Sequence, residues 1–135
     1  MIQISYPAII TATVVVVLFS TLYYFLLNKH VVALRATKLN KKQDVRTITT
    51  PNKLIIEVVR TYILGLILAY AIAMLGIQQL AQSATLSLWL WIGFPVVLFV
   101  GMVIHEHFPG RLAVIHAGDW LAKILIFTTI ITLWK

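Results

Sequence analysis

Residues 6–27 read YPAIITATVVVVLFSTLYYFLL, and no side chain in this stretch carries a charge. A helix needs about 20 mostly apolar residues to cross the hydrocarbon core of a bilayer, so this stretch predicts a membrane-spanning helix. Further apolar stretches follow at 54–77, 86–104 and 112–134. We therefore expect an all-α, integral membrane four-helix bundle that forms a single transmembrane domain over residues 1–135.

The composition excludes the other common classes of small protein. Of the 135 residues, 61% are hydrophobic and 11% are charged, cysteine is absent, and the mean hydropathy is +0.96. A soluble domain carries roughly 45–50% apolar and about 25% charged residues. A soluble globule, a disordered chain and a disulfide-stapled secreted domain are therefore excluded. The first stretch is expected to be retained, because residues 1–28 lack the basic start of a cleaved signal peptide.

The basic residues predict the orientation of the bundle. Eight of the eleven lie between positions 28 and 60, whereas the connection at 78–83 has none. These eight are Lys29, Arg35, Lys38, Lys41, Lys42, Arg46, Lys53 and Arg60. Cytoplasmic loops are enriched in Lys and Arg. The 28–53 connection and the turn that carries Arg111 are therefore expected in the cytoplasm, with both termini outside.

The 28–53 connection is expected to lie on the membrane surface. It begins as a basic amphipathic segment, and this pattern favours the anionic lipids of the inner leaflet. The side chains expected to contact lipid headgroups are Lys29, Arg35, Lys38, Lys41 and Lys42. Nucleic acid is not expected as a partner, because no aromatic stacking platform accompanies the charge.

Prolines predict where the helices begin, bend and turn. Pro51 suits the first position of the second helix, where its missing N–H is not needed. Lys53 and Glu57 then have the spacing of an ion pair on one helix face. Pro95 is expected to bend the third helix, and Pro109-Gly110 to form the turn before the fourth.

The second helix carries a stripe of small residues of the kind that lets membrane helices approach closely. The stripe consists of Gly65, Ala69, Ala73 and Gly76. One interpretation is packing inside the bundle, and the other is a contact face of a homo-oligomer. In the first helix, Ser20 and Thr21 are expected to bond to backbone carbonyls.

Three ionisable residues share one narrow face of the fourth helix. His116, Asp119 and Lys123 are spaced i, i+3 and i+7, and such residues are functional candidates inside a membrane span. At about 1.5 Å per residue, Lys123 lies roughly 16 Å inside the helix, near the bilayer midplane. Asp119 and Lys123 are four residues apart and can pair directly. Further partners considered for this face are Arg60, Glu106 and Arg111.

This polar face has two interpretations. In one, the Asp119–Lys123 pair is an internal clasp that fixes the register of the helices. In the other, the face lines a cavity open to the cytoplasm that binds a small solute or relays protons, for which histidine is well suited. The small size of the chain also fits a non-catalytic accessory subunit of a larger membrane complex.

A third interpretation is a membrane-embedded metalloenzyme. His105 and His107, together with His116, offer a ligand set for zinc or iron if the third helix ends at the first two. Their spacing is not the His-Glu-x-x-His of metalloproteases. We therefore expect no cofactor and no enzymatic activity, with this metal site as the alternative.

The second half of the chain contains several motifs in fixed order. They are WLWIGFP at 89–95, Glu106, LAVIHAGDWL at 112–121 and LW at 133–134. With the Tyr23-Tyr24 pair of the first helix, they resemble the bacterial domain of unknown function 1761 family. The resemblance implies four spans and a bacterial inner-membrane location, but no catalytic residues. This chain departs from the family in having His116, where members often carry Asn, and in its long 28–53 connection.

Overall fold

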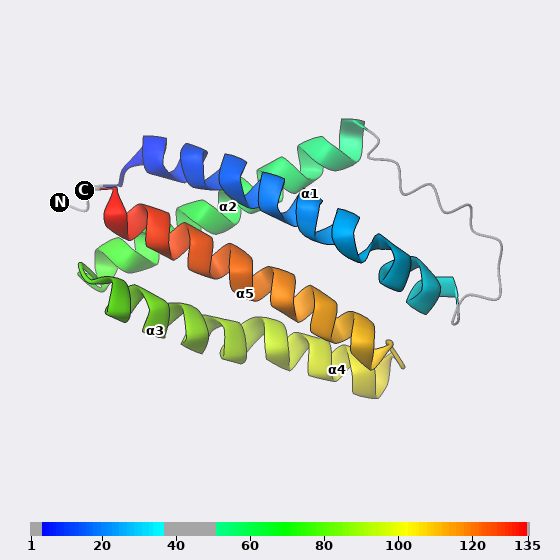
Figure 1. Ribbon diagram of the computed structural model, residues 1–135. Coiled ribbons are helices and arrows are strands. Elements are labelled where there is room, and N and C mark those ends of the chain that lie inside the picture. The colour runs from blue at the N-terminus through cyan, green and yellow to red at the C-terminus, as the bar shows by residue number, and fades with distance from the viewer. Residues whose placement is uncertain (1–3, 37–50, 135) are drawn as a thin grey trace.

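The computed structural model describes residues 4–36 and 51–134 (Figure 1). The described residues form helices and no strands. The helices are α1 (Tyr6–Ala36), α2 (Pro51–Met74), α3 (Leu80–Trp91), the π-helical segment η1 (Ile92–Val96), α4 (Val97–His105) and α5 (Gly110–Leu133). Because α3, η1 and α4 join into one helix over Leu80–His105, the structure has four helices long and apolar enough to cross a membrane.

The first helix is longer than the sequence predicts. It runs without a break from Tyr6 through Ala36, nine residues beyond the expected end at Leu27. The segment between them contains neither glycine nor proline, so nothing in it interrupts the helix. Lys29 is therefore exposed on the continuation of α1 rather than on a separate surface helix. Of the other residues assigned to lipid headgroups, Arg35 lies in α1, and Lys38, Lys41 and Lys42 lie outside the described residues.

Two local features set the ends of α2. Pro51 is the first helical residue, as its fixed φ favours. At the other end Gly76 adopts a φ of 62°, and the N–H of Ile77 donates to the carbonyl of Ile72 at 3.1 Å. This is the hydrogen-bond pattern of a Schellman motif, which ends the helix and turns the chain toward α3.

The third span departs from α-helical geometry around Pro95, the residue that is expected to bend it. The helix becomes π-helical over Ile92–Val96 around it and returns to α geometry at Val97. A π-helical turn accommodates a residue that lacks the N–H needed for the regular ladder.

Helix α5 is the centre of the bundle and packs against α1, α2, α3 and α4 (Figure 1). The core where α1, α2 and α5 meet is formed by Ala12, Val16, Leu68, Ile124 and Phe127, none more than 3% exposed. The beginning of α1 and the end of α5 lie at the same end of the bundle (Figure 1). The end of α1, the beginning of α2 and the α4–α5 turn lie at the opposite end.

The small-residue stripe of α2 contributes to this core over part of its length. Gly65 and Ala69 are buried, and a Cβ on Gly65 would overlap the ring of Phe127. Ala73 is partly buried, whereas Gly76 is exposed. Gly76 lies outside the packed stripe because it ends the helix in the left-handed conformation.

Candidate functional site

The centre of the site is an ion pair within α5. The ammonium of Lys123 lies 2.9 Å from the Oδ2 atom of Asp119, and the two side chains are 8% and 2% exposed. This is the pair that the i, i+4 spacing allows, and both members are removed from solvent. A buried ion pair needs further hydrogen bonds to offset the loss of hydration. The neighbouring helices α1 and α2 supply them.

Helix α2 supplies a second carboxylate, which sequence reasoning did not assign to the site. The Oε1 atom of Glu57 lies 3.0 Å from the ammonium of Lys123, and its Oε2 atom accepts a hydrogen bond from Arg60 at 3.0 Å. Glu57 was assigned to Lys53 from their spacing, but in the structure it joins Lys123 to Arg60. A signal was available, because Glu57 is the one acidic residue of a span-length apolar helix.

Helix α1 supplies two hydroxyl groups. Ser20 donates to the Oδ1 atom of Asp119 at 2.6 Å, and Tyr24 donates to its Oδ2 atom at 3.4 Å. The prediction that Ser20 bonds to a backbone carbonyl is therefore wrong, because a buried carboxylate on α5 faces it. Thr21, in contrast, donates to the carbonyl of Val17 as predicted.

His116 joins the same network through Tyr24. The Tyr24 hydroxyl lies 2.6 Å from the Nδ1 atom of His116. The imidazole also stacks against Phe99 of α4 and contacts Phe108 in the following turn. All three members of the predicted polar face thus take part in one hydrogen-bonded network. We call the set Ser20, Tyr24, Glu57, Arg60, His116, Asp119 and Lys123 the polar network.

The polar network lines a cavity of about 810 Å³. The cavity lies between α1, α2, α4 and α5, and ligand sites commonly have volumes of about 300–1,000 Å³. All seven members of the network contribute to its wall. Its other polar residues include Asn28 near the end of α1 and Lys53 in the first turns of α2. The cavity therefore occupies the half of the bundle that contains the beginning of α2 and the α4–α5 turn.

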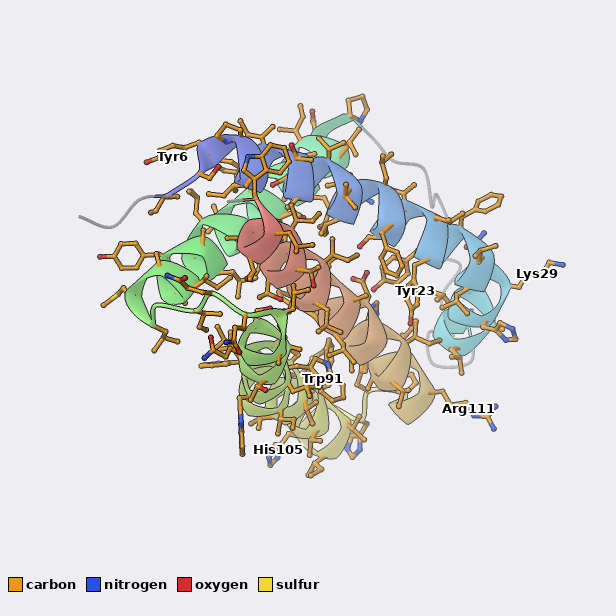
Figure 2. The ribbon with its side chains drawn as sticks, turned by 60° about the vertical axis from the view of Figure 1, so that its left-hand side comes forward. Tyr6, Tyr23, Lys29, Trp91, His105 and Arg111 are labelled. Atoms are coloured by element: carbon orange, nitrogen blue, oxygen red, sulfur yellow. The ribbon has the colours of Figure 1, made fainter. Side chains whose placement is uncertain are left out.

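Contacts between α3 and α5 hold the opposite side of α5. The hydroxyls of Ser87 and Thr128 lie 2.7 Å apart and are fully buried. The indole N–H of Trp91 donates to the carbonyl of Ala117 at 2.7 Å. On the α1 side, Tyr23 lies between the α1 and α5 ribbons (Figure 2) and donates to the carbonyl of Ile115 at 2.9 Å. These bonds fix the rotation of α5, so that Asp119 and Lys123 face the cavity.

Two of the further partners considered from sequence lie apart from the network. Glu106 and Arg111 are exposed in and after the α4–α5 turn, and Arg111 projects outward in Figure 2. Neither has an ion pair within residues 4–36 and 51–134. Arg60 is the one candidate partner that reaches the site, through Glu57.

The predicted metal ligands are not gathered into one cluster. His105 is the last residue of α4, and His107 follows it with a φ of 52°, both with exposed side chains. His116 is hydrogen-bonded to Tyr24. In the part of the chain that the structure describes, no three His, Asp or Glu side chains lie close enough together to hold one metal ion.

Comparison with known proteins identifies a family and no characterised relative. No curated protein and no solved structure matches the chain significantly. The family model of DUF1761, described as a protein of unknown function, matches residues 7–132. That match covers nearly the whole chain and includes all four apolar helices. The chain therefore belongs to the DUF1761 family of proteins of unknown function.

Proposed function

We propose that this protein is a multi-pass membrane protein that binds a small solute in the cavity beside the polar network. The observation that carries the proposal is the cavity of about 810 Å³ whose wall holds a continuous network of polar and ionisable side chains from three helices, centred on the buried pair Asp119–Lys123. A clasp that only fixed helix register would need packed surroundings, because a cavity beside a buried ion pair removes van der Waals contacts. Ionisable residues in a membrane protein commonly line such solute or ion pathways.

The network also has the chemistry to exchange protons with a bound solute. Hydrogen bonds and ion pairs connect His116 through Tyr24 and Asp119 to Lys123, and from there to Glu57. A proton added to one carboxylate weakens its ion pair and lets Lys123 favour the other. Binding of a charged solute can therefore be accompanied by a change of partner at Lys123.

The proposal includes an orientation and a location. We place the cavity at the cytoplasmic side of a bacterial inner membrane, with both termini outside. The distribution of basic residues supports this placement, because Lys29, Lys53 and Arg111 lie at the cavity end of the bundle. Fusion of a reporter enzyme to the C-terminus tests it, since activity confined to the outside is expected. Activity confined to the cytoplasm would reverse the orientation.

The function is tested by native mass spectrometry of the protein extracted gently from its own membrane. We expect a non-covalent small-molecule adduct on the wild-type chain that Asp119→Asn and the double variant Asp119→Asn/Lys123→Met both lose. In the double variant both charges of the buried pair are absent, so neither is left without the other. Loss of the adduct from this variant therefore reports on binding rather than on unfolding. An adduct that the stable double variant retains would contradict a binding role for the network and favour the clasp.

The same measurement tests the accessory-subunit alternative. A reproducible complex with a different protein, and no small-molecule adduct, would favour a non-catalytic subunit of a larger membrane assembly. A mass that equals several copies of this chain would instead indicate a homo-oligomer, and the adduct would then be counted per copy.

A further inference from the structure

We propose that the ligand of the cavity is an anionic amphiphile, which is a molecule with a phosphate or carboxylate group and an apolar chain. This inference rests on the proposed function, because it gives the chemical class of the solute bound in the same cavity. It depends on three observations: the balance of charge in the cavity wall, the position of Arg60, and the helices between which the cavity lies.

The wall of the cavity has a surplus of positive charge. It contains two acidic side chains, Glu57 and Asp119, and three basic side chains, Lys53, Arg60 and Lys123. Each carboxylate oxygen already has a partner: Glu57 bonds Lys123 and Arg60, and Asp119 bonds Ser20 and Lys123. The acidic groups are therefore satisfied, and a cationic ligand would find no free carboxylate.

Two of the three basic side chains lie together on α2. Lys53 and Arg60 are seven residues apart, with Glu57 between them, so that all three share one face of the helix. Lys53 has no ion-pair partner among the residues that the structure describes. Arg60 uses one nitrogen for Glu57 and keeps further N–H donors for a ligand. A guanidinium binds phosphate or carboxylate through two parallel hydrogen bonds.

Arg60 also shares its anionic partner among the described residues with a second basic side chain. It is nine residues from the start of α2, about 13 Å along the helix, and its side chain is 60% exposed. The one carboxylate that it meets, that of Glu57, is divided between Arg60 and Lys123, so a second anionic group would stabilise the guanidinium further. An anionic headgroup drawn into the cavity would meet both Arg60 and Lys53.

The cavity has an apolar side that suits a hydrocarbon chain. The residues of this side come from α1, α2, α4, α5 and the turn between α4 and α5. The apolar side chains in its wall are Val17, Phe25, Leu54, Phe99, Met102, Phe108 and Trp120. The outer sides of a membrane bundle face acyl chains, so a ligand that carries a hydrocarbon chain suits a cavity wall of this composition. A freely soluble anion would make no use of these side chains.

The inference is tested by measuring which probes the purified full-length chain binds in a nonionic detergent, by native mass spectrometry. The probes are dodecyl phosphate, inorganic phosphate, dodecyltrimethylammonium and dodecanol. We expect one dodecyl phosphate per chain and little binding of the other three. Arg60→Gln and Lys53→Gln each remove charge-assisted hydrogen bonds, and we expect each to weaken binding at least about tenfold. Arg111→Gln is the matched control, because it removes an exposed cation outside the cavity.

The probes separate failure of this inference from failure of the proposed function. Equal binding of inorganic phosphate would show that the source is a soluble anion, and equal binding of dodecanol would show that charge is not recognised. Preference for dodecyltrimethylammonium, or wild-type affinity in both Arg60→Gln and Lys53→Gln, would also overturn the inference. In each of these cases an adduct from the native membrane that depends on Asp119 would leave the proposed function standing.

Discussion

The ammonium of Lys123 on α5 lies 3.0 Å from the carboxylate of Glu57 on α2, which is 66 residues away in the sequence. With Asp119 at 2.9 Å, Lys123 is held between two carboxylates on two helices. This arrangement connects α2 to α5 in the first half of α2, where the residues on either side of Glu57 are exposed. The network is therefore both a contact between helices and the wall of a cavity.

The first prediction concerns the balance of charge at this pair. We expect Asp119→Asn and Lys123→Met each to lower the free energy of unfolding by about 3 kcal/mol, because each leaves a buried charge with fewer partners. The double variant is expected to lose at least about 2 kcal/mol less than the sum of the two. Equilibrium unfolding in mixed micelles measures this, with Arg111→Gln as an exposed control. Additive losses would show that the two charges do not interact.

A second prediction concerns Tyr24 and His116. Tyr24→Phe removes the hydroxyl that lies 2.6 Å from the Nδ1 atom of His116. We expect the ¹⁵N chemical shift of this ring nitrogen to change, with a loss of stability of about 1 kcal/mol. Tyr23→Phe is the matched control, because that hydroxyl bonds to the backbone carbonyl of Ile115. Equal shifts in the two variants would argue against a specific bond between Tyr24 and His116.

A third prediction concerns the close approach of α2 to α5. A Cβ on Gly65 would overlap the Phe127 ring and lie 3.1 Å from the Cγ2 atom of Ile9, and both of these side chains are fully buried. We expect Gly65→Ala to destabilise the protein by about 1–3 kcal/mol. Gly101→Ala is the control, because a Cβ there meets nothing within 4 Å. The control should be neutral or stabilising in a thermal unfolding assay, and equal melting temperatures would contradict the packing.

A fourth prediction concerns the hydroxyl contact between α3 and α5. Ser87→Ala and Thr128→Val each remove one partner of the buried 2.7 Å hydrogen bond. A double-mutant cycle should give a coupling of about 0.6–1.7 kcal/mol, which is typical of hydrogen bonds between membrane helices. Thr85→Ala is the control, because its hydroxyl is exposed and bonds only within its own helix. A coupling energy near zero would show that the two hydroxyls do not bond to each other.

The spans could be predicted from sequence because they depend on local composition. A run of about 20 apolar residues identifies a membrane helix without reference to the rest of the chain. The end of a helix cannot be predicted in this way where no glycine or proline interrupts it. Helix α1 continues past Leu27 for this reason. The prediction that Gly76 packs with the small-residue stripe of α2 is wrong. A small residue at the spacing of the stripe can also be the residue that ends the helix.

The site could be predicted only where its residues lie on one helix. His116, Asp119 and Lys123 were found together because helical spacing brings them to one face. Glu57 and Ser20 come from other helices, and which of their faces turn toward α5 depends on packing contacts far apart in the sequence. Spacing along the helix predicts that Glu57 pairs with Lys53. Contacts between helices, which this spacing does not contain, instead place Glu57 beside Lys123.

The core of Val16, Phe127 and buried Gly65 has a consequence for any molecule that enters the cavity. Val16 lies one turn beyond Ser20 in α1, and Phe127 lies one turn beyond Lys123 in α5. These side chains close the bundle directly behind the polar network, so the cavity is a vestibule that ends at this core. A molecule bound there is separated by this core from the opposite end of the bundle. Its passage to the other side would require α5 to separate from α1 and α2 at the Gly65–Phe127 contact.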